Sequence, residues 1–238
     1  MKFKANLFLT VLAILVFFLL VSLGNWQLDR AQEKQDLLDL QTSRINLSPV
    51  EIKLLDMTQA GLRYLPVKLN GKFDVNRQIL LDNQVRQGQV GYVVLTPLLL
   101  DENKAILVNR GWLPMSGDRN VLPNVDLKGE STSMMEGHLD HFPTVGIKLK
   151  GADVLSEGWP AVAQLVDVNK VSARLGYEIL PYQVLLGSNE SDGYDREWVP
   201  MKMGPEKNHG YAFQWFALSA AWVVLYFVVT IKLKRKEE

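Results

Sequence analysis

The 238-residue chain contains no cysteine, which excludes disulfide bonds, thiolate metal sites and thiol redox chemistry. Its 26 basic and 26 acidic residues cancel, so the sequence gives no support for nucleic-acid binding, which requires a basic excess or a basic face. Only three histidines are present, and the G-x-S-x-G, P-loop and G-x-G-x-x-G motifs are absent. No two carboxylates stand at a spacing that marks a general acid and base. We therefore expect that the protein is not an enzyme.

Two long hydrophobic runs stand near the ends of the chain. Residues 7–23, LFLTVLAILVFFLLVSL, and residues 211–231, YAFQWFALSAAWVVLYFVVTI, carry no charge. As helices they are roughly 25 Å and 31 Å long. For a bilayer core of about 30 Å the first is short but adequate, and the second is long enough. Both predict transmembrane helices. The alternative for the first run is a cleaved signal peptide, but its apolar stretch exceeds the usual ~7–15 residues.

The basic residues around the second run predict the topology. Four of them follow it (Lys232, Lys234, Arg235 and Lys236), whereas only two precede it closely. Positive-inside logic places the C-terminus in the cytoplasm, and two spans return the N-terminus to the same side. We expect a two-pass protein of the bacterial inner membrane, embedded in the lipid bilayer. Residues 1–6 and the basic tail 232–238 are then cytoplasmic, and residues 24–208 are extracytoplasmic and periplasmic.

The segment between the runs reads as mainly β, an α+β domain built on a small antiparallel barrel or sandwich. Residues 26–44 lack glycine and proline and predict that the first helix continues beyond the membrane. After them the hydrophobic period changes to two, and short strands bounded by turns follow. We expect strands at 67–73, 78–83, 91–100, 105–112, 133–141 and 182–187, a hairpin turn at 101–104, and loops at 114–131 and 188–208. One helix is expected at 167–176, with Asp167 as its N-cap and Gly176 as its stop.

His138 and His141 form an H-x-x-H pattern. On a strand, residues three apart point to opposite faces, so these two side chains are not expected to share a metal.

The second run carries an aromatic stripe. At about 100° per residue, Tyr211, Trp215, Trp222 and Tyr226 fall within about 60° of one another, with Gln214 at the edge. Such a stripe suits either a packed partner helix or a flat aromatic ligand, and Gln214 favours a hydrogen-bonding partner over lipid. Near the other run, Trp26, Arg30 and Lys34 share one helix face. They suit lipid headgroups, or else a docking surface for the domain or an anionic ligand.

Several motifs in order resemble the Surfeit locus 1 (Surf1) family. GNWQLDRAQEK (24–34) resembles its G-x-W-Q-x-x-R-x-x-x-K signature. GYVVLTPL (91–98), VNRGWLP (108–114) with Arg119, WPAVAQLVDV (159–168) and GYAFQWFALS (210–219) continue the resemblance over nearly the whole chain. It implies an assembly factor for haem-copper terminal oxidases, chiefly cytochrome c oxidase, that handles haem a and acts on subunit I beside other assembly factors.

The resemblance also implies which residues matter. The matching family positions are Trp26, Gln27, Arg30, Lys34, Asn109, Arg110, Gly111, Trp112, Tyr211, Gln214 and Trp215. His209 is the candidate ligand of the haem iron, because a neutral imidazole binds iron well. The porphyrin would then lie against Tyr211 and Trp215. Arg30 or Arg110 would pair with its propionates, since arginine binds carboxylates in a forked geometry.

The chain departs from the family at the histidine. In the family a histidine stands three residues before the tyrosine; here that position is Asn208, and His209 stands two before Tyr211. On a continuous helix this shift rotates the imidazole by about 100°, away from the aromatic stripe. If Asn208 is an N-cap, His209 can still face the stripe. The alternative function is a haem-free scaffold that holds a subunit I intermediate through protein contacts.

Overall fold

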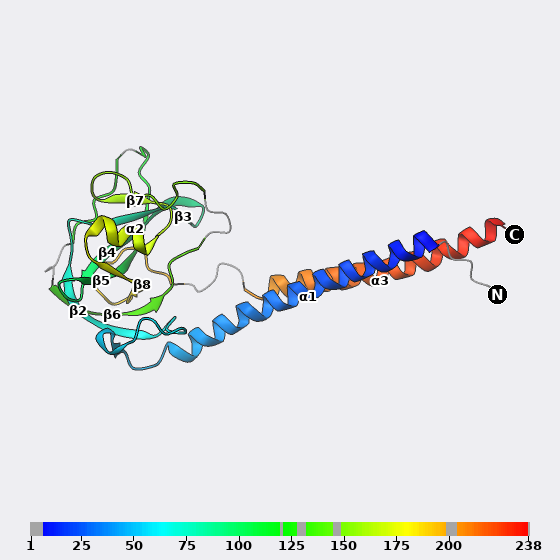
Figure 1. Ribbon diagram of the computed structural model, residues 1–238, viewed down its shortest axis with the longest axis horizontal. Coiled ribbons are helices and arrows are strands. Elements are labelled where there is room, and N and C mark those ends of the chain that lie inside the picture. Colours follow the sequence, from blue (N-terminus) through cyan, green and yellow to red (C-terminus); the bar gives the residue numbers. More distant parts are fainter. Residues whose placement is uncertain (1–6, 120, 128–131, 145–148, 199–203, 238) are drawn as a thin grey trace. The chain divides into compact units, whose positions relative to one another are not determined.

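The computed structural model describes residues 7–119, 121–127, 132–144, 149–198 and 204–237. The chain divides into two compact units (Figure 1). A helical unit contains α1 (Leu7–Arg44) up to Gln41 together with α3 (Glu206–Glu237), and a β unit spans Thr42–Trp198.

The helical unit is an antiparallel pair formed by the two ends of the chain. Thr10 Oγ1 lies 2.8 Å from the Tyr226 hydroxyl, and Trp222 Nε1 donates to the Ala13 carbonyl at 3.0 Å. Figure 1 shows the two helices side by side over much of their length. Small buried residues follow the seam between them at intervals of seven or eleven: Ala13, Gly24 and Ala31 on α1, and Ala212 and Ser219 on α3. Spacings near 3.5 residues keep one face of each helix against its partner.

Both helices are long and apolar enough to cross a membrane. Away from the seam their large apolar side chains are exposed, for example Phe8 at 71%, Leu15 at 62% and Val224 at 63%. An apolar surface around a whole helix pair suits lipid better than water. The continuation of the first helix to Arg44 is confirmed.

The β unit contains eight strands, one helix and a short 3₁₀ turn in the part of the chain that the structure describes. Their bounds are β1 (Val50–Glu51), η1 (Ile52–Leu54), β2 (Pro66–Phe73), β3 (Ile79–Arg86), β4 (Gln89–Leu99), β5 (Lys104–Pro114), β6 (Thr132–Asp140), β7 (Ala161–Ala163), α2 (Val168–Leu175) and β8 (Glu178–Leu186).

Five of the strands close a barrel. They run in the order β2-β6-β8-β5-β4, and β4 returns to β2 through Lys72↔Leu99 and Phe73↔Leu98. Inward-facing residues of these strands, such as Val67, Val108 and Val184, fill the interior with almost no exposure. Closure leaves these strands without open edges along the paired stretches.

The helix α2 and the outer strands lie outside the barrel. Asp167 caps α2 by accepting from the amides of Asn169 and Lys170, and Gly176 ends it in the left-handed conformation, as expected. The apolar side of α2 packs on β3, β4 and β5 through a second core that includes Val171 and Leu175.

The sequence-based assignment of the six longer strands is confirmed within a few residues, and three features differ from it. The barrel is not wholly antiparallel, because β5 and β8 pair in parallel. The short strands β1 and β7 and the turn η1 were not expected, since two or three residues are too few to show a period. The expected loop 188–208 ends earlier, because α3 begins at Glu206. Part of the expected loop 114–131 lies outside the described residues.

Candidate functional site

Asn208 lies at the seam of the helical unit and uses both ends of its amide. Its Nδ2 donates to Gln27 Oε1 at 2.6 Å, and its Oδ1 accepts from Lys34 Nζ at 2.7 Å. Gln27 and Lys34 are seven residues apart, which places them on one face of α1 two turns from each other. Ala31, 1% exposed, stands between them and admits α3 closely. We call Gln27, Lys34 and Asn208 the polar clasp.

A close helix contact lies one turn from the clasp. A Cβ atom added at Gly24 would lie 2.6 Å from Cε1 of Phe216. That distance is far inside van der Waals contact, so the first glycine of the GNWQ motif is needed for the ring of Phe216 to lie against α1.

The first turn of α3 is helical at Asn208. The amides of Asn208 and His209 both donate to the Pro205 carbonyl, at 3.0 and 3.1 Å. Asn208 is therefore not an N-cap, and the alternative in which His209 turns back toward the aromatic stripe is wrong. His209 is exposed and lies about 100° around α3 from Asn208.

The clasp residues divide the two helices into two sides. On α1, Trp26 and Arg30 are rotated about 100° and 60° backward from Gln27 around the helix axis. On α3, Tyr211 and Gln214 are rotated about 60° and 120° backward from Asn208. Viewed from one end, a step toward the N-terminus rotates in opposite senses around two antiparallel helices. Residues that precede the clasp residues on α1 and on α3 by these angles therefore lie on the same side of the seam. We call Trp26, Arg30, Tyr211 and Gln214 the aromatic flank.

The opposite side of the seam carries His209. His209 is rotated about 100° forward from Asn208, and Leu28 about 100° forward from Gln27. Phe213 follows His209 by one turn. We call His209, Leu28 and Phe213 the histidine flank. Leu28 is 40% exposed and Phe213 is 74% exposed.

The two aromatic rings of this flank lie at similar levels. The pairs Thr10–Tyr226, Ala13–Trp222 and Gln27–Asn208 fix the stagger of the helices, and by that stagger Trp26 lies within one or two residues of the level of Tyr211. The two rings are 50% and 53% exposed. Arg30 lies 5.9 Å from the Trp26 ring centre and pairs with Glu33 at 2.7 Å.

The deeper part of the aromatic stripe takes part in helix packing. Trp222 and Tyr226 are half-buried and bonded to α1, as described above, and Trp215 is half-buried as well. For Trp222 and Tyr226 the structure therefore favours the packing interpretation over a ligand.

Arg110 lies far from any surface of the β unit. It is 1% exposed, and its guanidinium donates to Gln78 Oε1, to the Val125 carbonyl and to the Asp192 carbonyl, each at 2.8 Å. The Tyr194 ring stacks on it at 5.0 Å. Burial lowers the pKa of Arg110. This arginine anchors two loops to the barrel, and its placement favours a structural role over pairing with a ligand.

The other residues of the VNRGW motif also hold the barrel together. Asn109 donates to Gln183 Oε1 at 3.0 Å. Gly111 has a φ of 112°, and a Cβ there would lie 2.7 Å from the Asp195 carbonyl. Trp112 donates from Nε1 to the Gln84 carbonyl at 2.8 Å, and its indole occupies the space that a side chain at Gly91 would take.

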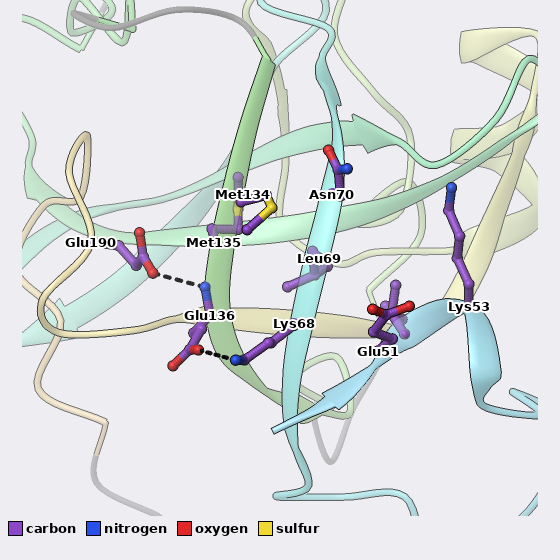
Figure 2. Close-up of a pocket in the computed structure, with 10 residues that line it drawn as sticks. Glu51, Lys53, Lys68, Leu69, Asn70, Met134, Met135, Glu136 and Glu190 are labelled. Atoms are coloured by element: carbon purple, nitrogen blue, oxygen red, sulfur yellow. Dashed lines mark hydrogen bonds and ion pairs between the residues drawn. The ribbon is translucent and has the colours of Figure 1, made fainter. Parts of the chain in front are cut away.

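An open hollow of about 380 Å³ lies on the β unit across β2 and β6 (Figure 2). Lys68 pairs with Glu136 at 3.3 Å, and the Glu190 carboxylate accepts from the Glu136 amide at 2.8 Å. Two lysines and three glutamates line it together with Asn70 and apolar side chains. None of the predicted site residues lines it.

The H-x-x-H histidines do not form a site. His138 is half-buried on β6, where burial lowers its pKa, and His141 lies beyond the strand with its ring 4.9 Å from that of Tyr182. Among the residues that the structure describes, no group of three or more His, Asp or Glu side chains is placed to hold a metal ion.

The sequence singled out Gln27, Lys34 and Asn208 separately but did not connect them. The available signal was the seven-residue spacing of Gln27 and Lys34, together with the polar residue Asn208 just before the second apolar run. Neither shows which residue of the other helix lies opposite.

The structure defines a class of protein: a β-barrel domain flanked in sequence by two helices that are long and apolar enough to cross a membrane. The family model described as the SURF1 family matches residues 14–220, and the chain belongs to this family, as its motifs indicated. Members of the family are generally cytochrome oxidase assembly factors.

Two SURF1-like relatives match most of the chain, and a third relative matches a shorter part of it. The SURF1-like protein of Rickettsia felis is 27% identical over 236 residues, covering 94% of this chain and 96% of the relative. That of Rickettsia bellii is 29% identical over 225 residues, covering 91% and 89%. Surfeit locus protein 1 of Arabidopsis thaliana is 36% identical over 107 residues, covering 40% of this chain and 30% of its own.

Proposed function

We propose that this protein assists the assembly of a haem-copper terminal oxidase, cytochrome c oxidase, by acting on its subunit I in the membrane. Membership of the SURF1 family supports an oxidase as the complex whose assembly this protein assists. The observation that carries the site is the polar clasp beside the aromatic flank, where motif residues of α1 meet α3 through hydrogen bonds. Among the described residues, no group of three or more His, Asp or Glu side chains is placed to hold a metal ion.

The proposed setting is the bacterial inner membrane, with both termini in the cytoplasm and the β unit in the periplasm. Two apolar helices of membrane length and bacterial relatives support it. The clasp then lies at the periplasmic edge of the bilayer, where polar side chains of the seam give way to apolar ones.

The five residues expected to hold haem a lie in different surroundings. His209 lies on the histidine flank, Arg30 and Tyr211 lie on the aromatic flank, and Trp215 lies near the seam. Arg110 is buried in the β unit. A haem bound by this set as a whole does not fit, and we assign no step of assembly to it.

A narrower haem proposal uses His209 without the aromatic flank. Its imidazole is exposed and reachable by an iron atom, and Phe213 one turn away offers an apolar ring for a porphyrin. The haem-free scaffold has a specific observation in its favour, since the family's histidine position is held by Asn208, whose amide is occupied by Gln27 and Lys34.

Absorption spectra distinguish haem binding by His209 from the haem-free scaffold. Wild-type protein and the His209→Ala and Asn208→Ala variants are purified from cells that make haem a. Haem handling by His209 predicts a haem a band that His209→Ala alone loses. The scaffold predicts no haem in any of the three, together with normal oxidase assembly in His209→Ala cells and none when the protein is deleted. Full oxidase assembly in deletion cells would contradict both modes.

A further inference from the structure

Gln214 carries a hydrogen-bonding side chain into an apolar helix and leaves it unpaired. It is exposed, and within the described parts of the chain its amide makes no hydrogen bond. The proposed span begins three residues earlier, so Gln214 lies about one turn inside it. Lipid chains offer no hydrogen bonds, and a glutamine in a membrane helix is instead satisfied by a neighbouring helix.

The surroundings of Gln214 form a strip that a helix can cover. Tyr211, Gln214 and Leu218 follow one another at three and four residues and share one side of α3. Tyr211 is 53% exposed and Leu218 is 52% exposed. Trp26 of α1 extends the strip near the level of Tyr211, and its indole N–H likewise has no acceptor among the described residues. Aromatic, amide and aliphatic groups in this order suit a protein helix better than acyl chains.

Charge at the outer end of the strip indicates the partner's chemistry. Arg30 and Lys34 lie at or beside this side of the clasp. Arg30 pairs with Glu33, and Lys34 donates to the neutral amide of Asn208, which leaves one positive charge in excess. The excess of positive charge is complementary to an acidic group at the outer end of a partner helix.

The histidine flank differs inside the span. There Phe213, Phe216 and Ala220 offer no hydrogen-bonding side chain, so lipid satisfies this side fully. The two sides of the helix pair are therefore not equivalent toward a partner.

We propose that the aromatic flank is the docking surface for one membrane-spanning helix of the oxidase subunit. That helix carries a hydrogen-bonding side chain opposite Gln214 and an acidic group opposite Arg30. This inference rests on the proposed function, because it takes the helix pair to lie in the membrane with the oxidase subunit as its client.

The absence of cysteine makes the surface directly testable. Leu218→Cys on the aromatic flank and Phe213→Cys on the opposite side are made in the full-length chain, so each protein has one thiol. Each is co-expressed with subunit I that carries single cysteines in the outer turns of its helices, and the membranes are oxidised. We expect Cys-linked product from the Leu218→Cys protein with one helix of subunit I and none from the Phe213→Cys protein.

The amide is tested in the same assay. Adding Gln214→Leu to Leu218→Cys is expected to lower the cross-linked yield about three- to thirty-fold, the range that membrane hydrogen bonds of ~0.6–2 kcal/mol imply. Gln214→Asn, which keeps the amide, is expected to retain part of the yield. Cross-linking of Leu218→Cys only to a second copy of this chain, or equal yields from the two positions, would overturn the proposal.

An assay of oxidase assembly distinguishes failure of the docking proposal from failure of the proposed function. If deletion of the protein leaves the oxidase assembled, the proposed function is wrong. If deletion abolishes assembly while Gln214→Leu leaves both assembly and cross-linking unchanged, the function stands and the docking surface is wrong.

Discussion

The amide of Asn208 joins the two ends of the chain, donating to Gln27 Oε1 at 2.6 Å while accepting from Lys34 Nζ at 2.7 Å. The two α1 residues belong to the N-terminal motif, and Asn208 stands where the family has a histidine. The polar clasp explains why the motif places glutamine and lysine seven residues apart: both face the same position of α3.

Loss of the clasp should weaken the helix pair. We expect Asn208→Ala to lower the free energy of unfolding by about 1–3 kcal/mol, because it leaves the half-buried Gln27 and Lys34 without their partner. Thermal unfolding of the full-length protein in detergent measures this. His209→Ala, at the exposed neighbouring position, is the control and should change stability by no more than about 0.5 kcal/mol. Equal effects of the two variants would contradict the clasp.

Gly24 and Gly210 offer a matched pair of helical glycines. Gly24→Ala should destabilise the helical unit by about 1–3 kcal/mol, since the new Cβ meets the Phe216 ring. Gly210→Ala meets nothing within 4 Å and should be neutral or stabilising by up to about 1 kcal/mol, because alanine favours a helix. Thermal unfolding compares the two, and adding Phe216→Leu should restore part of the loss in Gly24→Ala alone.

Arg110 should matter for folding of the β unit. Arg110→Met keeps the approximate length of the side chain but removes its donors. Gln78 Oε1 and the Val125 carbonyl then each lose one of their two hydrogen bonds, and the Asp192 carbonyl loses its bond from Arg110. We expect a loss of about 2–4 kcal/mol of stability. Lys68→Met is the control, because Lys68 pairs with Glu136 and both side chains are more than half exposed; it should cost about 1 kcal/mol or less. Chemical denaturation followed by tryptophan fluorescence reports both, and a near-neutral Arg110→Met would contradict the anchoring role.

Tyr64 has a buried hydroxyl without a hydrogen-bond partner among the described residues. Burial raises the pKa of Tyr64. Tyr64→Phe should therefore be neutral or stabilising, since it removes a polar group that is desolvated without compensation. Tyr182→Phe is the matched control: its hydroxyl donates to the Gln59 carbonyl at 3.1 Å, and its loss should cost about 1 kcal/mol. A clear destabilisation by Tyr64→Phe would show that the hydroxyl has a partner.

The sequence by itself determined the elements and their type. The two apolar helices, the six longer strands, the helix 168–175 with its Asp167 cap, and the family were all readable from it. These features depend on periodicity, capping and motif order, which are local properties of the chain.

Only the tertiary structure decided which residues meet. The parallel pairing of β5 with β8 and the closure of β2 on β4 join strands far apart in sequence. Arg110 is buried among carbonyls, whereas the sequence had offered it as an alternative to Arg30 for pairing with a propionate. The stagger of α1 against α3 placed Asn208 in the clasp, put His209 on one side of the seam and set Tyr211 on the other. A helix fixes the angle between two of its own residues, but only packing against a second helix decides which angle faces inward.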